Sequence, residues 1–194
     1  MLAQFVDAGS QGQPVFVPDI RETLAKSAAG EIVGILILPD GRSAKRFAIP
    51  CVSPGTLAPA ERSLLASYVR AEVYNHLTSL GGYSLDLYLD TNDDALVALV
   101  QEVIGEFQIE RSRAERTGYA RIVNVLDRMN DALHPARDPD ERRFSIALRD
   151  SRELPPAVES VAFRAEPDET FRAVASGLDG SVVCGLDIGG TDIK

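Results

Sequence analysis

Apolar residues in the first half of the chain recur with two different spacings, and each spacing predicts a different kind of element. A run rich in Ile, Val and Leu at residues 31–38 is followed by the turn residues Pro39-Asp40-Gly41-Arg42, and residues 45–52 then alternate partly between apolar and polar side chains. Two strand-like segments joined by turn chemistry predict a β-hairpin. Residues 83–90 alternate apolar and polar side chains, which predicts a third strand with one buried and one wetter face.

Helical spacing of apolar residues predicts two helices on either side of that third strand. The first covers residues 59–80, begins with Pro59 in its first turn and ends at Gly81-Gly82. The second starts after Thr91 or Asn92, either of which is suited to cap it. The apolar stripe of the second helix comprises Leu96, Leu99, Val100, Val103, Ile104 and Phe107.

The remaining segments give weaker patterns. We expect residues 1–14 to be a loosely held start, residues 15–17 a short strand, and Asp19 the N-cap of a short helix that reaches residue 28. Helical spacing resumes over residues 119–133 and does not separate one long helix from two. The last part predicts strands at 144–148 and 158–165, a short helix at 168–176 and a terminal strand.

This order of elements favours an α+β domain with an antiparallel or mixed sheet and helices on one face. We expect the domain, residues 1–178, to end near Leu178. A second domain is expected to begin at Ser181.

Composition limits the classes of protein to consider. The 194 residues are 45% apolar and 25% charged, with a formal net charge of −9. These are ordinary values for a globular core, and the acidity argues against a sequence-independent grip on nucleic acid. The longest apolar run, residues 32–38, is too short to cross a bilayer, and residues 1–4 do not resemble a signal peptide. We therefore expect a cytoplasmic protein with reduced thiols at Cys51 and Cys184.

The last eight residues carry the clearest chemical pattern of the chain. An apolar run of strand type ends at Ile188, with Asp187 just before its last residue. Gly189, Gly190 and Thr191 then form a turn, and Lys194 follows. Adjacent glycines let main-chain N–H groups approach phosphate oxygens closely. The threonine adds a hydroxyl, the lysine a point charge, and the aspartate a carboxylate suited to hydrated magnesium.

These residues resemble the first phosphate-binding motif, D-x-G-G-T-x-x-K, of the ROK family of repressors and sugar kinases, part of the actin-like ATPase superfamily. The resemblance covers only residues 187–194. It implies the first strand and turn of a truncated ribonuclease-H-like domain. It further implies that Asp187 organises Mg²⁺, that residues 189–191 cradle the phosphates of ATP, and that Lys194 neutralises their charge.

The family's catalytic aspartate, second phosphate loop, adenosine site and zinc cluster all follow this motif. The chain ends at Lys194, so we expect the front part of a longer protein that is not catalytic by itself. The leading interpretation is an N-terminal accessory domain of an ATP-dependent sugar kinase, with nucleotide and sugar as the ligands of the whole protein. The alternatives are a non-catalytic regulatory or ligand-binding member of the family, or the front part of an actin-like ATPase activator. A homo-oligomer is left open.

Four carboxylates near the third strand form a second candidate site, since hard cations prefer oxygen ligands. They are Asp86, Asp90, Asp93 and Asp94. Solvent-facing strand positions and helix capping explain them more simply. His76 and His134 lack neighbours at ligand spacing and are interpreted as surface or boundary residues.

Overall fold

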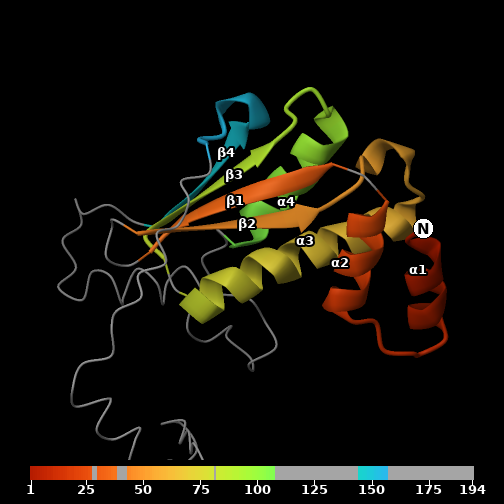
Figure 1. Ribbon diagram of the computed structural model, residues 1–194. Helices are drawn as coiled ribbons and strands as arrows, with labels where there is room; N and C mark the ends of the chain where they lie inside the picture. The colour runs from red at the N-terminus through yellow and green to blue at the C-terminus, as the bar shows by residue number, and fades with distance from the viewer. Residues whose placement is uncertain (28–29, 39–42, 81, 108–143, 157–194) are drawn as a thin grey trace, which may run out of the picture. The chain divides into compact units, whose positions relative to one another are not determined.

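A computed structural model describes residues 1–27, 30–38, 43–80, 82–107 and 144–156 of the chain (Figure 1). These residues form an α+β arrangement of one four-stranded mixed sheet and four α-helices. The elements are α1 (Ala3–Ser10), α2 (Val17–Lys26), β1 (Glu31–Ile37), β2 (Ala44–Pro50), the 3-10 turn η1 (Pro54–Thr56), α3 (Pro59–Leu80), β3 (Ser84–Leu89), α4 (Asp94–Phe107), β4 (Ser145–Asp150) and the 3-10 turn η3 (Ser151–Glu153).

The strands lie in the order β2-β1-β3-β4. β1 pairs antiparallel with β2, from Glu31 opposite Pro50 to Ile37 opposite Ala44, which confirms the predicted hairpin. β1 also pairs antiparallel with β3, whereas β3 and β4 run parallel. Of the two sheet types expected from the sequence, the mixed one is therefore present.

One face of the sheet carries the hydrophobic core. Its buried strand residues alternate along the strands and belong to one cluster with residues from α2, α3 and α4, so these helices cover the same face. The apolar stripe predicted for α4 is confirmed, since all six of its residues are buried. The strand residues of the cluster are Ile32, Leu36, Phe47, Ile49, Leu85, Leu87, Leu89 and Ile146.

The N-terminal segment differs from the expectation of a loosely held start. Residues Ala3–Ser10 form α1, and Leu2 is fully buried in the core. Gly9, Gly12 and Pro14 suggested a loop, but only Gly12 adopts a positive φ, of 74°, and it lies beyond the end of the helix. Gly12 therefore marks the exit from a helix, and Gly9 lies within that helix.

The predicted strand at residues 15–17 is also wrong, because Val17 is the first residue of α2. Phe16 is the N-cap, in extended conformation at φ −104° and ψ 138°, and Pro18 lies in the first turn. Proline fits the start of a helix, where its missing N–H has no partner to lose. Asp19, expected to be the cap, lies instead in the first turn, where its charge favours the helix dipole.

Residues Met1–Pro155 form one compact unit, and Pro156–Lys194 form a second. The helix expected at residues 119–133 and all elements expected after residue 157 lie outside the described residues. Among the residues that are described, no helix is both long and apolar enough to cross a membrane.

Candidate functional site

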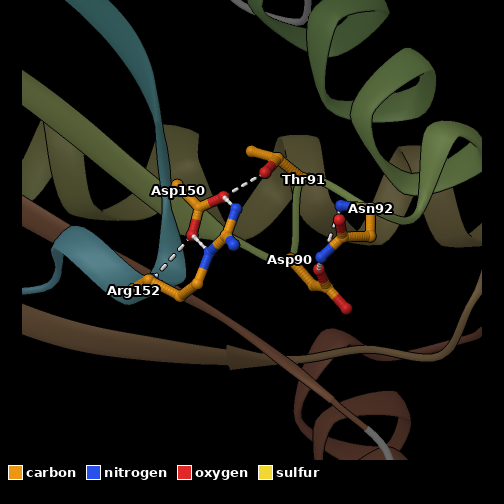
Figure 2. A network of polar contacts seen from close by, with 5 residues as sticks. All are labelled: Asp90, Thr91, Asn92, Asp150 and Arg152. Carbon is orange, nitrogen blue, oxygen red and sulfur yellow. Dashed lines mark hydrogen bonds and ion pairs between the residues drawn. The ribbon is translucent and has the colours of Figure 1, made fainter.

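Polar side chains gather where the parallel strands β3 and β4 end (Figure 2). The carboxyl ends of parallel strands are where open α/β sheets commonly place their ligands, so this edge is the first part of the fold to consider. Leu89 of β3 lies opposite Asp150 of β4, and Asp90 and Thr91 follow directly after β3. The topology thus brings residues about 60 positions apart in the sequence into one network.

Asp150 is the centre of this network. Its carboxylate accepts hydrogen bonds from the Thr91 hydroxyl, from the Arg152 backbone N–H at 2.8 Å, and from Nε and Nη2 of the Arg152 guanidinium, each at 2.8 Å. Only 13% of the Asp150 side chain is exposed. The Arg152 guanidinium, followed by the Thr91 hydroxyl, holds the pKa of the Asp150 carboxyl far below its usual range. The carboxylate is therefore fully engaged within the chain.

Asp90 and Asp93 shape the turn that leads into α4. Oδ1 of Asp90 accepts from the backbone N–H of Asn92 at 3.0 Å and from its side-chain Nδ2 at 2.8 Å. Oδ1 of Asp93 accepts from the backbone N–H of Leu96 at 3.0 Å. Asp93 is therefore the residue that caps α4, which corrects the expectation of Thr91 or Asn92. Those two side chains are committed elsewhere, to Asp150 and to Asp90.

These contacts give the four carboxylates separate structural roles. Asp86 points to the Nε of Arg149 on β4, 3.7 Å away, and Asp94 is the first residue of α4. Within the described ranges, no group of three or more His, Cys, Asp or Glu side chains is arranged to hold a metal ion. The capping interpretation is confirmed for Asp93.

A second polar cluster, which the sequence pattern did not predict, lies between α2 and α3. Glu72 of α3 is only 1% exposed, and among the residues described no other charged side chain is buried. Arg21 of α2 donates to both of its oxygens, Nε to Oε1 at 2.8 Å and Nη2 to Oε2 at 2.6 Å. The hydroxyl of Tyr68, one turn earlier on α3, is buried without a hydrogen-bond partner of normal geometry. Burial is the main reason that the pKa of Tyr68 is raised.

The signal for this pair was present but ambiguous. The apolar spacing of the helix at residues 59–80 passes through either Glu72 or Val73, and both are buried. A glutamate on the apolar side of a helix needs a cation from another element, because a buried carboxylate is costly unless it is paired. Sequence spacing cannot identify Arg21, which lies 51 residues away.

His76 occupies the next turn of α3. Its ring stacks on Phe47 of β2 with a centroid separation of 3.7 Å and an angle of 21° between the planes. Burial is the first cause that lowers the pKa of His76, and this favours the neutral imidazole. This agrees with the interpretation of His76 as a boundary residue of the core. His134 lies outside the described residues.

Cys51 is buried and free, and burial raises the pKa of its thiol to about 12. A thiol with so little thiolate at neutral pH is a poor nucleophile and a poor metal ligand. The residues of the phosphate-binding pattern, Asp187, Gly189, Gly190, Thr191 and Lys194, lie outside the described residues, as does Cys184.

Comparison with known proteins adds no relative to this picture. No protein-family model, no curated protein and no solved structure matches the chain.

Proposed function

We propose that the unit Met1–Pro155 is a non-catalytic accessory domain of an ATP-dependent sugar kinase of the ROK type. The nucleotide would be bound by a following domain of ribonuclease-H-like, actin-like fold, whose first strand and turn are residues 181–194. The observation that carries the proposal is the pattern Asp187, Gly189, Gly190, Thr191 and Lys194 at the end of an apolar run.

Each residue of that pattern has a role in this proposal. The backbone of Gly189, Gly190 and Thr191 would hold phosphate oxygens, and Lys194 would place a positive charge beside them. Asp187 would hold Mg²⁺, which neutralises charge on the phosphates. Catalysis of phosphoryl transfer consists mainly of positioning and electrostatic stabilisation, so these groups suit the reaction.

The polar groups of the first unit support a scaffolding role for it. Asp90 and Asp93 form the start of α4, Asp150 binds Thr91 and Arg152, and Glu72 is neutralised by Arg21. Side chains held in this way stabilise the fold, because each would leave unpaired buried or capping groups if it turned toward a ligand. The most conspicuous carboxylates of the unit are thus engaged in the structure of the domain.

The proposal is tested first on the protein in its source cells. An antibody raised against residues 1–155 should detect a species well above the 20.9 kDa of this chain. That species, once purified, should transfer the γ-phosphoryl group of ATP to a hexose from a panel. Asp187→Ala should abolish the transfer, because the carboxylate proposed to hold Mg²⁺ is lost.

A companion measurement uses the 194-residue chain alone. This chain should show no hexose-dependent turnover of ATP and, by titration calorimetry, weak or no binding of Mg-ATP. Turnover by this short chain that disappears in Asp187→Ala would contradict the accessory-domain proposal. A larger native protein that hydrolyses ATP without any sugar would favour the ATPase-activator alternative.

A further inference from the structure

We infer that residues 150–155 form an exit strap, a segment fastened to the sheet at both ends that fixes where the chain leaves the first unit. This inference goes beyond the proposed function and does not depend on it, because it rests only on contacts within Met1–Pro155.

The first fastening lies at the carboxyl end of β4. Asp150 accepts the Thr91 hydroxyl and is at the same time the N-cap of η3, through the backbone N–H of Arg152. Its carboxylate also holds the Arg152 guanidinium, so the strap begins with a closed ring of contacts (Figure 2). Hydrogen bonds to an ionised carboxylate are stronger than neutral ones. Thr91, one of the donors, belongs to the turn after β3. The start of the strap is therefore tied to the neighbouring strand.

The second fastening lies at the other edge of the sheet. Nη1 of Arg46 on β2 donates to the backbone carbonyl of Pro155 at 2.9 Å. β2 and β4 are the two edge strands of the order β2-β1-β3-β4, so they are separated by three inter-strand spacings, about 14 Å. The few residues after Asp150, together with the long arginine side chain, are sufficient to cover this width. The strap therefore runs across the sheet.

The face that the strap crosses is the one opposite the helices. Along β2, the side chains of Phe47 and Ile49 belong to the core. Successive side chains of a strand point to opposite faces, so Arg46 lies on the face opposite the core. Val33 and Tyr88 lie on this second face and are buried, although they do not belong to the core cluster. η3 contacts β3, the strand that contains Tyr88, and Figure 1 shows it folding back from the end of β4.

The strap has little conformational freedom of its own. The backbone N–H of Leu154 donates to the Ser151 carbonyl at 3.2 Å, which closes η3. Leu154 itself has φ −61° and ψ 120°, the extended conformation that a following proline favours. Pro155 and Pro156 then fix two further φ angles. A short segment that is both stiff and fastened at each end sets the direction of the chain at residue 156.

The strap is tested by amide hydrogen exchange, measured by NMR on the full chain at residues Arg152 and Leu154. Thr91→Val removes the first fastening and Arg46→Met removes the second. If the strap opens as one unit, each substitution should accelerate exchange at both amides, by about tenfold for Thr91→Val, since about 1.4 kcal/mol corresponds to a tenfold change in an equilibrium constant. Arg46→Met should accelerate exchange less than Thr91→Val does, because the lost hydrogen bond ends on a neutral carbonyl and not on a carboxylate. The acceleration should again appear at both amides.

Matched controls separate opening of the strap from general destabilisation. Thr91→Ser retains the hydroxyl and should behave as the unaltered chain does. Thr78→Val on α3 removes a hydroxyl that donates within its own helix, to the backbone carbonyls of Tyr74 and Asn75, and should leave both amides unchanged. Exchange that changes only at the amide nearest each substitution, or at neither amide, would overturn the inference, since the two fastenings would then act separately.

Discussion

At the scale of single residues, the hairpin depends on Gly34. This residue lies opposite Phe47 in the register of β1 and β2, and the phenyl ring lies flat over it. The other side of the ring stacks on His76 of α3. An aromatic side chain that covers a glycine on a neighbouring strand restores the apolar contact that the glycine lacks. The ring of Phe47 therefore packs between Gly34 of β1 and His76 of α3.

We predict that Gly34→Ala destabilises the protein. A Cβ atom at this position would lie 2.2 Å from Cζ of Phe47, and the ring cannot retreat because His76 is behind it. Overpacking of this kind costs about 1–3 kcal/mol, measured as the free energy of unfolding in urea. His76 should also lose its stacking, which NMR shifts of its imidazole protons would report.

Gly105→Ala on α4 is the matched control. Nothing lies within 4 Å of a Cβ placed there, and the residue is in a helix. The alanine should therefore stabilise the protein, by about 0.5–1 kcal/mol. If both substitutions had the same effect, the close approach of Phe47 to Gly34 would not be the cause.

The residue scale also shows where sequence reasoning is limited. The apolar stripe of α4 could be read from spacing alone, since burial of a helix face follows its period. The choice of cap could not, because Thr91, Asn92 and Asp93 are all good capping residues. Asp150, 59 positions away, engages the Thr91 hydroxyl, while Asp90 engages the Asn92 side chain, which leaves Asp93 as the cap. Local propensity is overruled there by a contact that only the folded chain contains.

At the scale of elements, α2 is held to α3 by apolar packing and by one ion pair. Ile20 and Leu24 of α2 are buried in the core, and Arg21 between them reaches Glu72. The pair is asymmetric, because 46% of the Arg21 side chain is exposed whereas 1% of the Glu72 side chain is. Water can solvate the Arg21 guanidinium if this side chain turns away from Glu72. The buried Glu72 carboxylate, in contrast, depends on Arg21 for its hydrogen bonds.

We predict that Arg21→Met is destabilising because it leaves Glu72 buried without a partner. The expected loss is about 1–3 kcal/mol in urea unfolding, the cost of an unsatisfied buried group. The double variant Arg21→Met/Glu72→Met should regain most of this loss, since apolar side chains of similar volume commonly replace a buried ion pair at little cost.

The exposed pair Lys26–Glu22 on the same helix is the control for loss of a charge. Its side chains are 73% and 66% exposed, so Lys26→Met should change stability little. A double variant no more stable than Arg21→Met would mean that Glu72 has a role other than pairing with Arg21.

The N-terminal helices show why the sequence predicted some elements better than others. The hairpin strands flank a clear turn signal and α3 has 22 residues between Pro59 and a pair of glycines, and all three were found with nearly correct bounds. α1 has only eight residues, and α2 begins within the apolar run Val15–Val17. Short elements of this kind are marginal by themselves and form because they pack on a core, as Leu2 does. That packing is invisible to local patterns.

At the scale of the whole molecule, the sequence predicted a mixture of helices and strands and the β1–β2 hairpin, but not the pairing of β3 with β1 and with β4. The parallel pair β3–β4 joins strands separated by more than fifty residues, and no local turn signal announces it. Nucleotide-binding residues were predicted only from the pattern at residues 187–194, which lies outside the described part of the chain.

We predict that a fragment of residues 1–156 unfolds in one cooperative transition. The described core cluster lies entirely within Met1–Pro155, and the exit strap fastens the end of this unit to the sheet. A second fragment that ends at Leu178, the boundary expected from the sequence, should therefore melt within about 4 °C of the first, since about 1 kcal/mol shifts the midpoint by 2–4 °C at this size. Circular dichroism and calorimetry on both fragments make the comparison. A shorter fragment that failed to fold while the longer one folded would show that residues 157–178 belong to the first domain, as the sequence alone suggested.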